Sequence, residues 1–298
     1  METEVLEYFL KIAEYENITR ASRELHVAQP HLTRQLHSLE ENLGVPLFVR
    51  EKRRLHITEE GRYVRQQTQQ ILNLLHKMQD QVHAIHDGQG GKLYIGTIET
   101  IGTTYLPAWI ASFRQQYPRV KYSLWTANSQ DVIDRLHHRL IDVAFVREPF
   151  DREQYHSLQV LDEEWMALMN VDHPLAKANP GTLQMSQLAE ADLIVPTQRS
   201  RQISNWFGEQ GLDVNIVCEY APFVNAITMA ERGLGVAILP ESAMYVVSNH
   251  PVTARRIIPA HRSTACLVWR RDMDIPGAAA RFIAYIQQWA AENQPLST

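Results

Sequence analysis

Apolar positions recur at helical spacing from residue 4 to about residue 86, and a different rhythm begins near residue 91. Residues 4–15 predict a first helix, and Asn17 or Thr19 would begin the next one. A third helix is indicated by leucines at steps of four and three residues, which turn one apolar face inward. These leucines are Leu32, Leu36, Leu39 and Leu43. Residues 55–57 follow as the returning strand of a ribbon.

A long helix is predicted next, because Thr58 to Gly61 form an acidic first turn and no proline follows before His86. Its apolar residues form a heptad seam with polar interruptions at Gln67 and Gln81. The seam consists of Val64, Ile71, Leu74, Met78 and Ile85. A solitary helix of this kind is marginal, so we expect it to pair with a second copy and to form a homodimer. The alternative is that the seam packs on the chain's own C-terminal domain.

Residues 87–91, Asp-Gly-Gln-Gly-Gly, break the pattern and predict a linker. Beyond them strands and helices alternate, which predicts an α/β domain with parallel sheets. Strands are expected at 93–96, 120–125, 141–146, 192–195, 214–219, 236–239 and 266–269, and helices at 103–117, 129–139, 203–210, 223–232 and 276–292. The rhythm repeats from Trp165, so two similar lobes are predicted. The expected domains are 1–58, a linker helix at 59–87, and 88–298, with lobe I at 92–161 and 268–298 and lobe II at 162–267.

The third helix carries polar side chains on the face opposite its leucines, and a basic ribbon follows it. Thr33, Arg34 and His37 would point outward, and such a face can enter the major groove of DNA. The ribbon residues Arg50, Lys52, Arg53 and Arg54 would neutralise phosphates. The alternative for this charge run is an ordinary solvated surface. The chain's formal net charge is -5, so a protein that coats nucleic acid everywhere is disfavoured, and the basic surplus is confined to this module.

In α/β lobes, ligands gather where strands end and helices begin, because free backbone N–H groups face that edge. Three such ends carry polar side chains, and a loop arginine would overlook the same crevice. The candidate ligand-binding residues are Thr97, Glu99, Thr100, Ile101, Asn128, Ser129, Arg147, Pro196, Thr197 and Arg199. A small anionic metabolite would suit these donors, although Glu99 opposes an anion. The alternatives are helix capping by the Ser and Thr residues and pairing of Arg147 with Glu148 or with an acid across the cleft.

Other chemistry finds little support in the sequence. No nucleophile elbow, zinc-protease or phosphate-loop motif is present, so an enzyme is the weaker hypothesis. Cys218 and Cys266 have no metal or redox spacing and are expected to be small buried residues. No metal site and no cofactor are expected. The start of the chain lacks a secretory signal and no apolar run approaches membrane-spanning length, so we expect a cytoplasmic protein without a membrane partner.

The segment from Ile18 to Gly61 closely resembles the N-terminal domain of LysR-type transcriptional regulators. The resemblance rests on Ala21, Leu25, Gln29, Pro30, the run Leu39 to Phe48, Arg50, Leu55, Thr58 and Gly61. It implies an all-α winged helix-turn-helix, a dimerising linker helix and a two-lobed effector domain built like a periplasmic solute-binding protein. Two departures stand out. Ala28 stands where the family usually has Ser or Thr, and His31 stands where a small residue is common and would add a base or phosphate contact.

The resemblance also implies partners and residue roles. A dimer or tetramer would bind an operator with dyad symmetry, act as activator or repressor, and contact RNA polymerase when it activates. Gln29, Pro30, Thr33 and Arg34 would be positions of the DNA-binding face, and a small-molecule co-inducer would contact the cleft. By resemblance that contact falls to Thr100, Asn128, Ser129, Arg147 and Thr197. The competing hypotheses are a DNA-binding protein whose C-terminal domain ignores ligands and, with less support, an enzyme.

Overall fold

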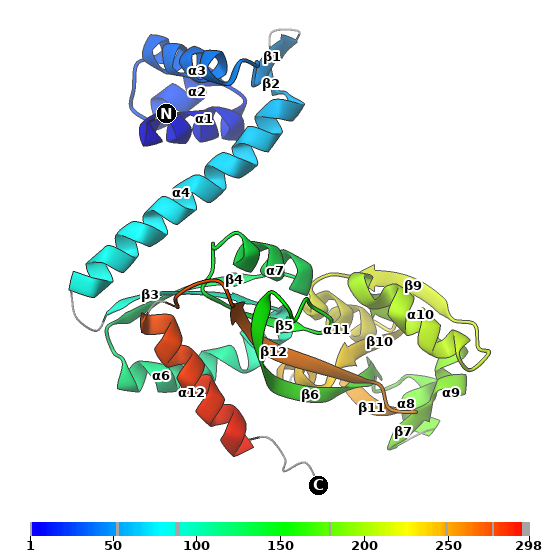
Figure 1. Ribbon diagram of the computed structural model, residues 1–298. Helices are drawn as coiled ribbons and strands as arrows, with labels where there is room; N and C mark the ends of the chain where they lie inside the picture. The colour runs from blue at the N-terminus through cyan, green and yellow to red at the C-terminus, as the bar shows by residue number, and fades with distance from the viewer. Residues whose placement is uncertain are drawn as a thin grey trace. The chain divides into compact units, whose positions relative to one another are not determined.

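The computed structural model describes residues 2–51, 54–86, 90–178, 180–247, 250–275 and 277–293. The chain divides into two compact units, Met1–His86 and Asp87–Thr298 (Figure 1). Each unit has its own apolar cores, which fits the length of the chain. Residues 87–89 of the expected linker lie outside the described residues, and Gly91 already belongs to the first strand of the second unit.

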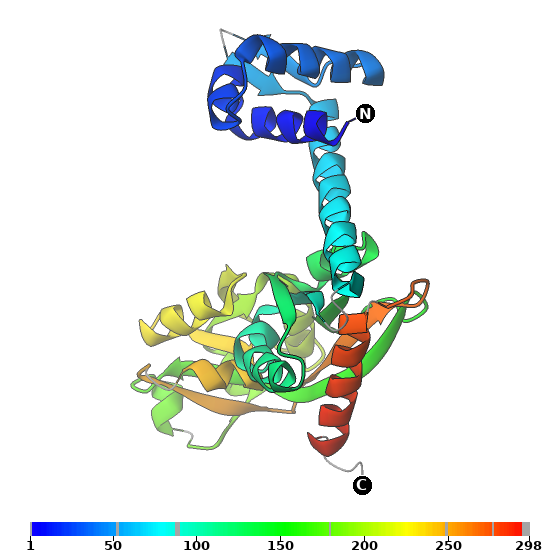
Figure 2. The ribbon, with the colours of Figure 1, turned by 90° about the vertical axis from the view of Figure 1, so that its left-hand side faces the viewer.

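The N-terminal unit is a winged helix-turn-helix that leads into one long helix (Figure 2). Its elements are α1 (Thr3–Tyr15), α2 (Ile18–Glu24), α3 (Gln29–Leu43), β1 (Phe48–Glu51), β2 (Arg54–Ile57) and α4 (Glu59–His86). The Asn17 side chain accepts a hydrogen bond from Arg20 N at 2.9 Å and so begins α2. Gly44 ends α3 in the left-handed region at φ 73°. The winged architecture expected from the sequence is confirmed.

The apolar face of α3 is shorter than its leucine spacing predicts. Leu32, Leu36 and Leu39 are buried in the core between the helices, but Leu43 is 41% exposed. Leu43 is the last residue before the Gly44 turn, so no element of this unit lies over it. The expectation for Leu43 was therefore wrong. Ala28 precedes α3 without a side-chain cap, and Pro30 in the first turn removes one N–H that would otherwise need a partner.

The wing is fixed to the helices by polar contacts. Glu40 Oε1 accepts hydrogen bonds from Leu47 N at 2.8 Å and Phe48 N at 3.2 Å. Thr58 Oγ1 donates to Pro46 O at 3.0 Å and accepts from Gly61 N at 2.9 Å. These contacts tie α3, the wing and the start of α4 into one body.

Helix α4 leaves most of its described seam in solvent. Ile71, Leu74, Met78 and Val82 are exposed, with Met78 at 54%, whereas Val64 packs on the winged-helix core. The side chains of Gln81 and Ile85 lie outside the described residues. An exposed apolar row on one helix is a surface that a second copy would cover. Dimerisation through α4 therefore stays a prediction, and the exposed apolar row of α4 is the surface expected to form the interface.

The C-terminal unit consists of two lobes of strands and helices. Its strands are β3 (Gly91–Thr97), β4 (Val120–Thr126), β5 (Val143–Arg147), β6 (Tyr155–Asn170), β7 (Thr182–Gln184), β8 (Asp192–Pro196), β9 (Asn215–Tyr220), β10 (Val236–Pro240), β11 (Val252–Ile258) and β12 (Arg262–Arg270). Its helices are α5 (Glu99–Thr104), α6 (Leu106–Gln116), α7 (Ser129–His137), α8 (Pro174–Ala178), α9 (Met185–Ala189), η1 (Thr197–Arg199), α10 (Ser200–Gly208), α11 (Phe223–Glu231), η2 (Glu241–Val246) and α12 (Gly277–Asn293). The strand order is β4-β3-β5-β12-β6-β10-β8-β9, with β11 and β7 paired beside β6.

Three expected features take a different form, and β6, β7, β11, α8 and α9 were not expected. The sheets are mixed, because β12 runs antiparallel to β5 and β6, and β10 and β11 run antiparallel to β6. The expected helix 103–117 is two helices, α5 and α6, joined at Tyr105. The second crossing between lobes comes earlier than expected, since residues 265–268 of β12 already pair with the lobe I strand β5. The other expected strands and helices are present near their predicted bounds.

The two lobes share one uninterrupted strand. The first part of β6 pairs with β12 in lobe I, and its last part, from Trp165, pairs with β10 and β11 in lobe II. Figure 1 shows β6 and β12 running side by side between the lobes. The return passes through the short link 259–261, where Trp165 N donates to His261 O at 2.9 Å. Both crossings therefore lie together on one side of the cleft described next.

Candidate ligand cleft and DNA-binding face

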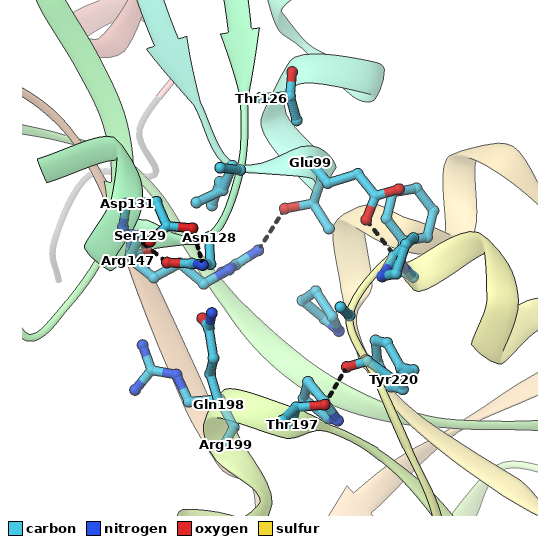
Figure 3. Close-up of a pocket in the computed structure, with 18 of the residues that line it drawn as sticks. Glu99, Thr126, Asn128, Ser129, Asp131, Arg147, Thr197, Gln198, Arg199 and Tyr220 are labelled. Carbon is cyan, nitrogen blue, oxygen red and sulfur yellow. Dashed lines mark hydrogen bonds between the residues drawn. The ribbon is translucent and has the colours of Figure 1, made fainter. Parts of the chain in front are cut away.

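A cleft of about 580 Å³ lies between the lobes of the C-terminal unit. Lobe I contributes the N-terminal ends of α5 and α7 and the end of β5, and lobe II contributes η1 and the turn between β9 and α11 (Figure 3). These are strand ends and helix starts, which is where α/β lobes gather ligands. The lining residues are Ile98, Glu99, Thr100, Thr126, Ala127, Asn128, Ser129, Asp131, Arg147, Trp165, Pro196, Thr197, Gln198, Arg199, Tyr220, Ala221, Pro222, Phe223 and Pro240.

All but two of the ligand-binding candidates lie on this cleft. Thr97 is buried, and its hydroxyl donates to Ile98 O at 3.0 Å. Ile101 is fully buried in the lobe I core, on the inner face of α5. Thr97 is the last residue of β3 and Ile101 lies in α5, and both side chains are directed into lobe I. The structure therefore does not place Thr97 and Ile101 with the others.

Arg147 lines the cleft but is bound within the protein. Its guanidinium donates to Ser263 Oγ at 3.0 Å, to Thr100 Oγ1 at 3.1 Å and to Glu163 Oε1 at 2.6 Å. Glu163 lies on β6 and also accepts from Ser242 Oγ of lobe II at 3.0 Å. All of these side chains are buried. Arg147 therefore pairs with Glu163 at the lobe crossing, and not with Glu148, and its guanidinium is largely engaged before any ligand arrives.

The hydroxyl and amide candidates are also engaged. Asn128 caps α7, accepting from Asp131 N at 2.9 Å, and Ser129 Oγ accepts from Arg147 N at 3.1 Å. Thr197 Oγ1 donates to Tyr220 O at 3.1 Å. Each of these contacts holds a loop that forms the wall of the cleft. Capping and positioning, one of the alternatives that the sequence left open, is what these side chains do in the structure.

Glu99 and Arg199 each reach toward the opposite lobe. Glu99 Oε2 accepts from Phe223 N, at the start of α11, at 2.7 Å. Burial raises the pKa of the Glu99 carboxyl, and the Phe223 hydrogen bond lowers it by less. Arg199 donates to Glu148 O at 2.5 Å and to Gln202 Oε1 at 2.9 Å. Burial, and then the nearby charge of Arg147, lower the pKa of Arg199.

An apolar wall was missed by the sequence reasoning. Trp165, Tyr220 and Phe223 line the cleft together with Pro196, Pro222 and Pro240. The aromatic residues look like ordinary core residues in the sequence, and all three are indeed buried, yet they also line the cavity. Gln198 also lines the cleft, and Figure 3 shows its amide directed toward Arg147. The position of Gln198 directly after the β8 end was the signal that could have included it.

The DNA-binding candidates gather on α3 and the wing. Gln29, Pro30, Arg34 and His37 are exposed, and Arg50 is exposed on β1. Thr33 is half-buried and its hydroxyl donates to Gln29 O at 3.0 Å, so it stays close to the helix backbone. His31 packs edge-to-face on Tyr8, with ring centroids 5.9 Å apart. Lys52 and Arg53 lie outside the described residues, as does the side chain of Arg54.

Within the described part of the chain, no group of three or more His, Cys, Asp or Glu side chains is arranged to hold a metal ion. None of the described helices has the length and apolar character needed to cross a membrane. Cys266 is buried, whereas Cys218 is only half-buried on β9, so the expectation of two buried cysteines was wrong for Cys218.

Comparison with known proteins agrees with both units. Residues 3–62 match the model of the bacterial regulatory helix-turn-helix protein, lysR family, and residues 86–291 match the LysR substrate binding domain. The chain belongs to the LysR family of transcriptional regulators. It therefore combines the DNA-binding and substrate-binding domains of that family, and its similar proteins are transcriptional regulators.

Two curated LysR-family relatives span nearly the whole chain. The HTH-type transcriptional regulator YybE of Bacillus subtilis (strain 168) is 28% identical over 96% of this chain and 98% of its own length. The Hca operon transcriptional activator HcaR of Escherichia coli (strain K12) is 27% identical over 97% of this chain and 98% of its own length. The fold matches the LysR family regulator CbnR, at a TM-score of 0.83 and 22% identity over 97% of this chain and 99% of that one. CbnR has also been solved with its target DNA.

Proposed function

We propose that this LysR-family chain binds operator DNA of dyad symmetry as a homodimer or homotetramer, and that a small molecule in the inter-lobe cleft changes that binding. The observation that carries the ligand half is a cleft of about 580 Å³ whose walls come from both lobes. A ligand held there binds one lobe arrangement better than others, and only such a difference in affinity shifts a conformational population.

The DNA half is supported by the exposed polar face of α3. Gln29, Arg34 and His37 are exposed on this helix, and Arg50 on the wing offers a phosphate contact. His31 is occupied by Tyr8, so it positions α3 rather than extending toward a base. Lys52, Arg53 and Arg54 remain proposed phosphate contacts from the sequence. The exposed α4 seam supports pairing of two such units on half-sites related by a dyad.

The cellular role follows from the same proposal. DNA as the partner places the protein in the cytoplasm, and RNA polymerase is the further partner wherever it activates. The HcaR relative is a transcriptional activator by name, which makes activation the first mode to test. We propose no catalytic activity and no organic cofactor or metal, in keeping with a sequence that lacks the nucleophile-elbow, zinc-protease and phosphate-loop motifs. An enzyme and a regulator with an inert C-terminal domain remain the competing hypotheses.

The test uses the wild-type protein to select DNA fragments from a random library. The affinity of the protein for a selected fragment is then measured by fluorescence anisotropy. Arg34→Ala weakens that affinity by about 1–3 kcal/mol if Arg34 contacts a base edge. Arg65→Ala removes the same charge from an exposed position on α4 and serves as the matched control. Equal affinity of Arg34→Ala and wild type would remove Arg34 from the DNA-binding face. Absence of any selected sequence would contradict the regulator.

A further inference from the structure

The cleft holds one unmatched charge of each sign, and they come from opposite lobes. Glu99 belongs to α5 of lobe I and Arg199 to η1 of lobe II. Figure 3 shows the two side chains on different walls of the cavity. The charges of Glu99 and Arg199 that no protein group balances indicate which charged groups a ligand should carry. This inference rests on the proposed ligand cleft.

Glu99 has no cationic partner among the described residues. Its Oε2 accepts the Phe223 amide at 2.7 Å, at the start of α11, where the helix dipole offsets only part of the carboxylate charge. The other carboxylate oxygen, Oε1, has no hydrogen bond within the described chain. Half-burial makes the free charge costly, which is why burial is the main cause that raises the pKa of this carboxyl. A ligand group that brings a positive charge to Oε1 would relieve that cost.

Arg199 is a cation without an anionic partner among the described residues. Its guanidinium donates to the Glu148 carbonyl and the Gln202 amide oxygen, which are both neutral acceptors. Within the part of the chain that the structure describes, no carboxylate pairs with it, and the nearby Arg147 adds a like charge. The neighbouring Gln198 side chain is exposed on the same wall. A negative ligand group beside Arg199 and Gln198 would gain charge-assisted hydrogen bonds.

The other charged groups of the cleft are already matched. Arg147 has its ion pair with Glu163, and both are buried. Asp131 is exposed to water in the first turn of α7, where the helix dipole favours a carboxylate and the Asn128 amide donates to it at 2.6 Å. Neither Arg147 nor Asp131 therefore needs a charged ligand group to balance its charge.

The same cleft also has an apolar, aromatic wall. Trp165, Tyr220 and Phe223 line the cleft and offer an apolar surface to the body of a ligand. We propose that the cleft binds a zwitterion with an apolar side chain, a free amino acid or a close analogue. Its ammonium group faces Glu99, its carboxylate faces Arg199 and Gln198, and its side chain lies on the aromatic wall.

Ligands of a single charge fit less well. A carboxylate without an ammonium group leaves Glu99 uncompensated and adds a second negative charge to the cleft. An amine without a carboxylate leaves the positive charge of Arg199 uncompensated. Matched molecules that differ only in these groups therefore separate the alternatives.

The experiment uses the full-length protein and thermal unfolding with the common amino acids, each beside its amine and its acid. L-Phenylalanine stands beside 2-phenylethylamine and 3-phenylpropanoate, and L-leucine beside 3-methylbutylamine and 4-methylpentanoate. At least one zwitterion should raise the unfolding midpoint while its amine and acid at equal concentration do not. Calorimetry of that zwitterion then gives the Kd for the variants.

Glu99→Gln should weaken the zwitterion by about 10-fold or more and remove the discrimination against the matching acid. Arg199→Gln should weaken it similarly and remove the discrimination against the amine. Arg201→Gln and Glu209→Gln, which change exposed residues outside the cleft, should leave the Kd unchanged.

Three results overturn the inference: acids or amines that stabilise more than their zwitterions, an unchanged zwitterion Kd in both Glu99→Gln and Arg199→Gln, or no stabilisation by any member of the panel. In each case selective DNA binding by the wild type would leave the regulator intact. Loss of the inference and loss of the proposed function are therefore separate outcomes.

Discussion

Arg147 and Glu163 form a buried ion pair, with Nη2 and Oε1 2.6 Å apart and both side chains 8% exposed. The pair stands where β6 leaves lobe I, and Ser242 of lobe II joins it through the same carboxylate. A guanidinium first expected to meet a ligand thus belongs to the join between the lobes. Its removal would change the stability of the domain before it changed ligand recognition.

Arg147→Met should lower the free energy of unfolding of the C-terminal unit by about 3–5 kcal/mol, because it leaves the Glu163 charge buried without a partner. The double variant Arg147→Met/Glu163→Leu should regain most of that loss. Urea unfolding followed by tryptophan fluorescence measures it, since all 6 tryptophans lie after residue 91. The control is Arg262→Ala, which breaks an exposed pair with Asp162 and should cost no more than about 1 kcal/mol. Equal losses of unfolding free energy in Arg147→Met and Arg262→Ala would contradict the stabilising role of the Arg147–Glu163 pair.

Met78→Asp should dissociate the proposed dimer, because it places a carboxylate in the exposed apolar seam of α4. Gln79→Asp introduces the same charge one position further on, at a residue that is exposed outside the seam, and should keep the dimer. Sedimentation velocity across a range of protein concentrations distinguishes the two. A Met78→Asp protein that sediments like wild type would place the dimer interface elsewhere.

Gly61→Ala should destabilise the join between the wing and α4. A Cβ at this position would lie 2.2 Å from the Leu47 carbonyl oxygen, which is backbone and cannot turn aside, and 2.7 Å from Ile57 Cγ1. We expect a loss of about 1–3 kcal/mol, as for other overpacked sites. Amide hydrogen exchange in residues 3–62 measures it. Gly208→Ala, where nothing lies within 4 Å of an added Cβ, should leave exchange in that segment unchanged.

The two cysteines should differ in reactivity. Burial raises the pKa of the Cys266 thiol to about 11, and only the thiolate reacts. At pH 8 the folded protein should therefore incorporate iodoacetamide at the half-buried Cys218 and leave Cys266 unmodified, as peptide mass spectrometry would show. The Cys266 thiol loses its proton near its ordinary pKa of 9.0 in the unfolded chain but only near 11 in the folded one. Above about pH 9 the ionisation of Cys266 therefore stabilises the unfolded chain, and the free energy of unfolding should fall. Labelling of Cys266 at pH 8 before Cys218 would contradict this assignment.

Local signals predicted the N-terminal unit well because each of its boundaries is set by a nearby residue. Asn17 caps α2, Gly44 ends α3, and Gly61 follows the acidic start of α4. The C-terminal lobes were harder, since β6 shows no break in sequence where it passes from one lobe to the other. β11 was also not predicted, although Thr253 and Arg255 alternate with apolar residues as in a half-buried strand.

The cleft was predicted in outline and not in chemistry. Strand ends located its walls, because that rule depends on topology alone. The partners of Arg147 could not be predicted, since Glu163 and Ser263 come from distant strands that meet only in the folded sheet. The aromatic wall was missed for a similar reason: hydrophobic spacing cannot distinguish a buried ring from one whose edge faces a cavity.

The continuous strand β6 also determines how the lobes can move. A flexible loop between two bodies absorbs rotation in a few backbone dihedrals, but β6 is hydrogen-bonded on either side of the crossing. Rotation of one lobe therefore has to be spread along the ladder as extra twist, and the free energy rises steeply with angle. We therefore expect a ligand in the proposed cleft to produce a small rotation of one lobe against the other, and the resting angle to return when the ligand leaves.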